Sequence, residues 1–244
     1  MNKFLWVTVL LLPVYSMAAN VDKVTKQEIK RIKEIPEIKQ LDCASFDTSS
    51  VTLDKNKSVL LVESVFKTNK IRNDSKILCD IDSDYGTNSY KISFKETFVI
   101  DGVPVGLQHT DGSGIVGKEY SDSKTWLTAC KTDAMTDEYT CAIMKDDLVI
   151  IKSKDGYKVV VGTKHFPGKT ALIRLDKNKP TESSEKGQYS HQQSAQLIND
   201  MANAKTVTTR FIQWPYEKYV DSTMDMTNFN VAKKVLDLIY EKHN

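Results

Sequence analysis

The first nineteen residues have the pattern of a cleavable secretory signal, which decides the redox environment in which the rest of the chain folds. One lysine makes the start positive, residues 4–14 are apolar and uncharged, and Ser16 and Ala18 are the small residues of a cleavage site. A membrane anchor is the alternative, but this stretch spans only about 16 Å as a helix, and a bilayer core is about 30 Å thick. We expect residues 1–19 to be removed on export to the periplasm, the cell surface or the extracellular space.

The charge of the remaining chain argues against one large class of partner. The formal net charge is +2, and removing Lys3 leaves +1, with acidic and basic residues interspersed throughout. Nucleic-acid binding needs a strong field of one sign, so we expect no nucleic-acid partner. No stretch after the signal is apolar for long enough to span a bilayer, so we predict no transmembrane segment in the mature chain.

Four cysteines, Cys43, Cys79, Cys130 and Cys141, follow the signal. An even number of cysteines in an exported chain predicts disulfides, and four cysteines allow three pairings. We expect neighbours in the sequence to pair, because each such pair falls inside one proposed domain. A metal site is the alternative, but no Cys-x-x-Cys occurs and no histidine is near any of the four.

The patterns divide the chain after the signal into three parts. Residues 20–40 form a charged arm with isoleucines at helical spacing, which we expect to pack on the body or to fray from it rather than to lie on a membrane surface. Residues 41–118 read as a β-rich domain and residues 119–244 as an α+β domain. The glycine-rich segment 110–118 is predicted to be a linker or a long loop between them.

Strand signals dominate the first of these domains. Residues 59–62 and 77–79 are short apolar runs, and residues 90–94 alternate between apolar and polar side chains, as in a half-buried strand. Asp101-Gly102 between apolar runs predicts a hairpin. Pro104 lacks a backbone N–H and would place the second strand of that hairpin at a sheet edge.

The second domain combines strands with two helices. Ser190 is predicted to cap one helix, and a second is predicted from about residue 228 to residue 241, whereas residues 180–187 read as a polar loop. Strands are predicted at 125–130, 139–144, 148–152, 157–161, 171–175 and 206–212. The expected fold class is therefore α+β and β-rich, with sandwich-like antiparallel sheets and a C-terminal helix, in two small domains.

The second domain resembles the invasion-associated locus B family of bacterial exported proteins. The pattern consists of Trp126 with Cys130, Cys141-Ala142, Met201-Ala202-Asn203-Ala204-Lys205 before Val207, and Asp225-Met226-Thr227-Asn228-Phe229 opening a helix at Ala232. Residues 46–79 are similar to surface-adhesin E-type domains. Both resemblances imply β-rich, disulfide-bonded envelope proteins associated with host contact, and neither supplies a catalytic residue that can be transferred here.

Three acidic residues at alternate positions, Asp80, Asp82 and Asp84, are the weak candidates for a metal site. Oxygen ligands suit calcium, but an EF-hand loop starting at Asp80 needs glycine and glutamate where this chain has Tyr85 and Lys91. We therefore favour a solvated acidic turn and predict no metal and no cofactor.

No catalytic motif is evident in the sequence. Neither His-Glu-x-x-His nor Gly-x-Ser-x-Gly occurs, and the four histidines are far apart. A hydrolase with a site around His165 is an alternative hypothesis, but the sequence from His165 to Gly168 is more typical of a turn between strands. We predict no enzymatic activity.

The predicted binding surface consists of Arg210, Trp214, Tyr216, His165 and Phe166. Large aromatic residues usually pack in the core, but they also anchor many interfaces, and Trp214 and Tyr216 lie where a strand leaves for a loop. The sequence favours a protein that acts by binding a protein partner in the envelope or in a host. A purely structural envelope component is the second alternative.

Overall fold

The computed structural model describes residues 30, 34, 45–47, 58–62, 70–83, 89–108 and 111–243. The predicted signal 1–19 lies outside these residues, and so does the arm 20–40 except for Lys30 and Glu34.

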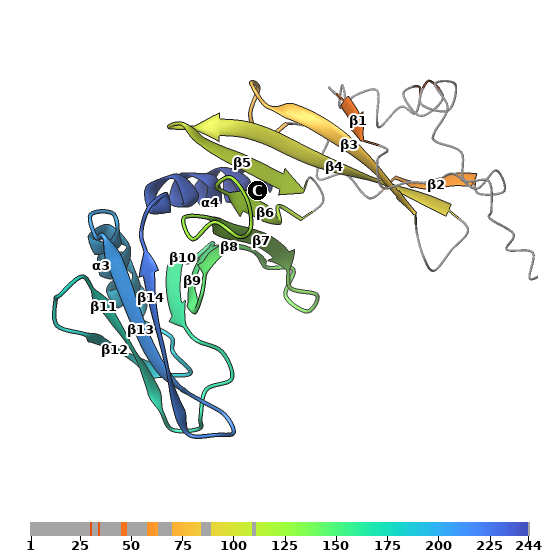
Figure 1. Ribbon diagram of the computed structural model, residues 1–244. Helices are drawn as coiled ribbons and strands as arrows, with labels where there is room; N and C mark the ends of the chain where they lie inside the picture. The colour runs from red at the N-terminus through yellow and green to blue at the C-terminus, as the bar shows by residue number, and fades with distance from the viewer. Residues whose placement is uncertain are drawn as a thin grey trace, which may run out of the picture.

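Ten strands form one large sheet, which crosses the upper half of Figure 1. The order is β1-β3-β4-β5-β6-β7-β8-β9-β10, and pairing is antiparallel throughout from β3 to β10. β1 pairs in parallel with β3, and β2 pairs in parallel with β4. The strands are β1 Ser45–Asp47, β2 Ser58–Val62, β3 Lys76–Ser83, β4 Ser89–Ile100, β5 Val103–Gln108, β6 Gly114–Val116, β7 Trp126–Thr132, β8 Tyr139–Lys145, β9 Leu148–Ser153 and β10 Gly156–Val161.

A second, four-stranded antiparallel sheet has the order β12-β11-β13-β14 and lies at the lower left of Figure 1. Its strands are β11 Thr170–Leu175, β12 Thr181–Glu185, β13 Thr206–Gln213 and β14 Lys218–Asp225. Two helices complete this part of the chain, α3 His191–Met201 and α4 Phe229–His243. The predicted β-rich α+β class, with antiparallel sheets and a C-terminal helix, is confirmed.

One core cluster joins both sheets and both helices. α4 lies against β6 to β9 of the large sheet, and α3 lies against β10 and beside the four-stranded sheet (Figure 1). Trp126 is fully buried in this cluster, packs its ring 5.5 Å from that of Phe229, and donates its indole N–H to the carbonyl of Thr227. The start of α4 is thereby fixed to the large sheet.

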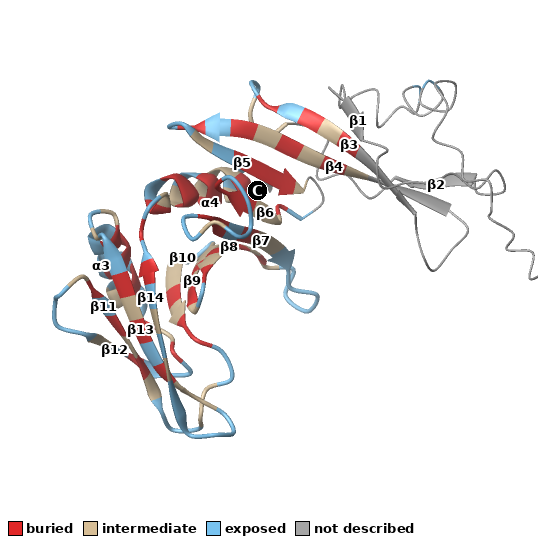
Figure 2. Cartoon of the chain, in the orientation of Figure 1, coloured by how far each residue is buried: buried red, intermediate tan, exposed pale blue. Residues whose placement is uncertain are grey.

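Several local predictions from the sequence are confirmed. Asp101 and Gly102 both have positive φ and close the hairpin of β4 and β5. Ser190 caps α3 through a capping box with Gln193. Burial alternates along β4, where buried and partly exposed bands follow one another in Figure 2.

The segment 110–118, predicted to be a linker or loop, contains β6. This strand pairs with β5 on one side and with β7 on the other. The large sheet therefore continues across the predicted boundary between residues 118 and 119. Because β6 has only three residues and begins with a glycine, its sequence is too short to show the alternation of a strand.

The prediction that Pro104 marks an edge strand is wrong, because β5 lies between β4 and β6. The carbonyl of Pro104 accepts the N–H of Gly117, so its nitrogen faces the β6 side. The paired residues of β6 end at Val116, opposite Val105, and the missing N–H of Pro104 therefore falls where the ladder ends.

The segment 180–187 is not a loop, because it contains β12, which pairs with β11. The sequence of β12, Thr-Glu-Ser-Ser-Glu, has no apolar residue, so nothing in it resembles a half-buried strand. Ser183 is nevertheless buried and accepts the N–H of Ala171, and a hydroxyl thus takes the inward position that an apolar side chain usually occupies.

Cys130 and Cys141 are opposite each other on β7 and β8 and form a disulfide. This pairing agrees with the prediction. Cys79 is also disulfide-bonded, but its predicted partner Cys43 lies outside the described residues. None of the helices in the described ranges combines the length and the apolar character needed to cross a bilayer.

Candidate functional site

The four-stranded sheet buries one face and leaves the other open to solvent. Along β13, Val207, Thr209 and Phe211 are buried, whereas Arg210 between them is exposed. β11 shows the same alternation, with Ile173 directed into the core. The outer face is therefore a surface on which side chains from four strands stand side by side.

Strand register brings four residues from different strands into one row on this outer face. Glu182 is opposite Leu172, Leu172 is opposite Arg210, and Arg210 is opposite Asp221. Together with Tyr219 and other neighbours, most of this row lines a shallow hollow of about 370 Å³. The row thus combines charged and apolar side chains at the centre of the face.

Arg210 is the central charged residue of the row. Its Nε and Nη2 donate to the two carboxylate oxygens of Asp221 at 2.7 and 2.6 Å, and its guanidinium lies 5.4 Å from the ring centre of Tyr219. These hydrogen bonds raise the pKa of Arg210 and lower the pKa of Asp221. Both side chains are about half exposed, so the pair orients the guanidinium while leaving it accessible.

Aromatic side chains gather where β13 and β14 turn. The rings of Phe166 and Trp214 are 5.3 Å apart, and Trp214, Tyr216 and Tyr219 are 53%, 81% and 62% exposed. The end of this hairpin is at the bottom of Figure 2, where exposed and intermediate residues prevail. We call the group formed by Phe166, Arg210, Trp214, Tyr216 and Tyr219 the aromatic face.

Backbone hydrogen bonds hold the loop before β11 against this hairpin. The N–H of Phe166 donates to the carbonyl of Ile212 at 2.9 Å, and the N–H of Trp214 donates to the carbonyl of Lys164 at 2.8 Å. The peptide bond from Trp214 to Pro215 is cis. Phe166 and Trp214 are therefore presented by a hydrogen-bonded frame rather than by a free loop.

Of the five residues predicted from the sequence, Phe166 and Trp214 contact each other, Arg210 and Tyr216 are exposed on the same hairpin, and His165 packs against the core instead. Its ring packs 5.2 Å from that of the buried Phe211, and both ring nitrogens are buried without a hydrogen-bond partner in the described part of the chain. A hydrolase centred on His165 requires a nucleophile within about 3.2 Å of a ring nitrogen, and no described residue fills that role.

The acidic residues singled out in the sequence lie partly outside the described residues. Asp80 and Asp82 belong to β3, so the predicted acidic turn is wrong at these two positions, and Asp84 is not described. The strand extends through them because β4 pairs with it along its whole length. No cluster of metal-ligating side chains occurs among residues whose side chains are described.

Tyr219 and Asp221 belong to β14, a strand that is not among those predicted from the sequence. A signal was present, because Tyr219, Asp221 and Thr223 alternate with Val220, Ser222 and Met224. The alternation was obscured because the inward positions include a serine and the outward positions include a tyrosine.

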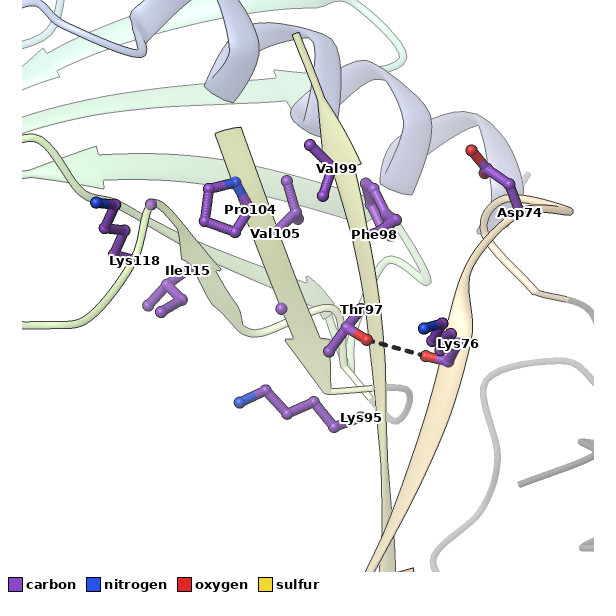
Figure 3. A pocket seen from close by; sticks show the side chains of 12 residues that line it. Asp74, Lys76, Lys95, Thr97, Phe98, Val99, Pro104, Val105, Ile115 and Lys118 are labelled. Atoms are coloured by element: carbon purple, nitrogen blue, oxygen red, sulfur yellow. Dashed lines mark hydrogen bonds between the residues drawn. The ribbon is translucent and has the colours of Figure 1, made fainter. Parts of the chain in front are cut away.

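A second surface, on the large sheet, was not anticipated from the sequence. It is an open trough of about 510 Å³ over β3, β4, β5 and β6, drawn in Figure 3. Val99, Pro104 and Ile115 form its apolar part. Lys76, Lys95 and Lys118 line it as well, and we call this surface the lysine trough. Its residues come from separate strands and a loop, so no short sequence motif could have revealed it.

Searches against protein-family models, curated proteins and solved structures found no match.

Proposed function

We propose that this chain is an exported bacterial envelope protein that acts by binding a protein partner, in the envelope or in a host, through its aromatic face. The observation that carries the proposal is the position of Trp214, Tyr216 and Tyr219, all more than half exposed, on the hairpin of β13 and β14 that also holds the Arg210–Asp221 pair. Tryptophan, tyrosine and arginine are the residue types that most often supply the binding energy of protein interfaces.

The way these side chains are held also supports binding. The Trp214 ring packs at an angle against the Phe166 ring, and Arg210 is oriented by Asp221 and Tyr219. A side chain that is ordered before association loses less conformational entropy on binding than a free one. The aromatic face is therefore suited to recognise a partner without large rearrangement.

Two further observations support export. The Cys130–Cys141 disulfide is of the kind that persists in oxidising compartments, and the first nineteen residues have the pattern of a secretory signal. The resemblance to the invasion-associated locus B family implies the same location. We infer that the mature chain starts after Ala18 or Ala19, which the N-terminal sequence of the purified native protein will test.

Affinity capture with the mature protein from its own envelope fraction tests the binding proposal. The wild type should recover a partner that Trp214→Ala and Tyr219→Ala recover at least tenfold less, because removing an interface anchor costs about 2 kcal/mol or more. Tyr120→Ala is the matched control, because Tyr120 is an exposed aromatic outside the aromatic face.

The control variant should recover as much partner as the wild type. If all three variants recover the same partner equally well, the aromatic face is not the binding surface. Circular dichroism and melting curves of each variant will show that a loss of capture does not come from unfolding.

A further inference from the structure

We propose that the lysine trough of the large sheet binds a small anionic amphiphile, a molecule with an aliphatic body and one phosphate or carboxylate head. This site is on a different sheet from the aromatic face and does not depend on the proposed protein partner. Its volume of about 510 Å³ lies within the range of about 300–1,000 Å³ that is usual for small-molecule sites.

The trough lies on the outer face of the large sheet. Along β4, the side chains of Phe94, Glu96 and Phe98 are buried, whereas Lys95, Thr97 and Val99 alternate with them. The register places Thr97 opposite Gly106, and Gly106 opposite Ile115 on β6.

Gly106 allows the chain of Lys95 to lie across β5. A Cβ atom at this position would approach Cε of Lys95 to 2.9 Å, which is closer than carbon atoms tolerate. The absence of a side chain at Gly106 thus lets a lysine reach over the middle of the sheet.

The charges around the trough select an anion. Lys76, Lys95 and Lys118 have no hydrogen bond or ion pair from their amino groups within the described part of the chain. The acidic residue of the lining, Asp74, is held by two hydrogen bonds of 2.8 Å from Arg72, which lower its pKa. Three lysines without a partner among the described residues therefore line the trough, whereas its acidic residue is already paired with Arg72.

Figure 3 shows how the lysines lie relative to the apolar part. In this view Lys118, Lys95 and Lys76 are on different sides of the group formed by Val99, Pro104 and Ile115. Val99 is exposed, and Ile115 is buried without belonging to the core cluster of the other face. An apolar surface flanked by three lysines fits a ligand with an aliphatic body and a negative head.

An acidic peptide fits this surface less well. β4 and β5 each lie between two other strands of the large sheet, so neither is an edge strand to which a peptide could add. The N–H and C=O groups of a peptide would lie against Val99, Pro104 and Ile115, where they find no hydrogen-bond partner. An aliphatic chain has no such groups to satisfy.

The apolar surface continues beyond the trough in one direction. Ile115 is opposite Leu127 on β7, and Leu127 is opposite Met144 on β8. Leu127 is exposed, and Met144 is half-buried. A chain longer than the trough would follow this row across the sheet. The length of the aliphatic chain should therefore affect the affinity.

Calorimetric titration of the mature protein with dodecyl phosphate, below its micellar concentration, tests the proposal. We expect binding that weakens about tenfold for each of Lys76→Gln, Lys95→Gln and Lys118→Gln, because a charge-assisted hydrogen bond contributes about 1.5–3 kcal/mol. Lys179→Gln is the matched control, because Lys179 is an exposed lysine in the turn between β11 and β12.

Three further ligands test separately whether the aliphatic body is needed, whether the negative head is needed and whether an acidic peptide can bind instead. Inorganic phosphate and dodecyltrimethylammonium should bind at least a hundredfold more weakly than dodecyl phosphate, because each lacks either the aliphatic body or the negative head. A Glu-rich hexapeptide should also bind more weakly. Equal or tighter binding of any of the three would overturn the assignment of the ligand class.

Two variants test the position of the aliphatic chain. Gly106→Val fills the middle of the trough and should abolish binding in a protein whose circular dichroism is unchanged. Leu127→Asn should weaken dodecyl phosphate several-fold more than octyl phosphate, because the shorter chain ends before the row on β7. If dodecyl phosphate binds all the lysine variants as tightly as the wild type, the trough is not the site.

Discussion

The rings of Phe166 and Trp214 lie with their centroids 5.3 Å apart and join the loop before β11 to the hairpin of β13 and β14. Two backbone hydrogen bonds at the same place give this contact its fixed geometry. The two residues are far apart in the sequence, and the antiparallel register makes them neighbours. The proposed function depends on this junction, because it presents Trp214 at a defined position.

Replacing Trp214 with alanine should separate binding from stability. Trp214 is half exposed, so we expect the free energy of unfolding to fall by only about 1 kcal/mol. Partner affinity should fall by about thirtyfold or more, as for an interface anchor. Urea denaturation and a binding titration on the same samples will show whether the two effects differ in this way.

Glycine at position 187 should be indispensable. It has φ +70°, and an added Cβ would lie 2.0 Å from the carbonyl oxygen of Val161 and 2.7 Å from the His165 ring. We expect Gly187→Ala to cost about 3 kcal/mol or more, since both backbone and ring would have to move.

Gly168 offers the matched control, because its φ is +72° and an added Cβ would meet no atom within 4 Å. Gly168→Ala should cost only the left-handed backbone penalty of about 1 kcal/mol. Equal losses in the two variants, measured by chemical denaturation, would show that the crowding at Gly187 is unimportant.

The Cys130–Cys141 disulfide should stabilise the fold by restricting the unfolded chain. The two residues are eleven positions apart, and a loop of that size corresponds to about 3 kcal/mol. We expect the double variant Cys130→Ala, Cys141→Ala to melt at a lower temperature than the oxidised wild type. If this bond provides the stabilisation, a reducing agent will lower the melting temperature of the variant less than that of the wild type.

Asp237 on α4 should make stability depend on pH. Burial opposes its ionisation, but hydrogen bonds from Lys152 at 2.6 Å, from the hydroxyl of Tyr157 and from Lys233 at 3.1 Å outweigh that effect and lower its pKa. A lowered pKa in the folded state adds stability above the ordinary pKa of 3.8, and this stability is lost as the pH falls through the lowered value.

Asp237→Asn should therefore cost about 1–3 kcal/mol at pH 7. The difference from the wild type should shrink as the pH falls below 4, because protonation removes the same charge from the wild type. Unfolding curves collected between pH 2 and pH 7 will measure this difference. A constant difference over that range would mean that the charge of Asp237 does not contribute.

Much of the fold could be predicted because the strands carry local signals. The alternation near Tyr90 and Phe94, the Asp101-Gly102 turn and the Ser190 cap each depend on neighbouring residues alone. β12 and β6 gave no such signal, since one has no apolar residue and the other is very short. Both are strands because adjacent strands supply their hydrogen bonds.

The site was only partly predictable for the same reason. Alternation along one strand places Arg210 on the same side as Ile212, and aromatic residues near a strand end indicate an exposed anchor. The position of His165 depends on how the loop before β11 pairs with Gln213, which is a contact between distant segments. The lysine trough is formed only by the register of four strands, so it could not be predicted from the sequence.

The most direct test of the central claim is site-specific photo-cross-linking in cells that export the protein. A photoreactive amino acid at Tyr216, at the tip of the aromatic face, should give one defined adduct with the partner. The photoreactive amino acid placed at Met135, which is exposed in the turn between β7 and β8, should give no adduct. An adduct that forms at Met135 and not at Tyr216 would contradict the account, because the partner would then bind the turn between β7 and β8 and not the aromatic face.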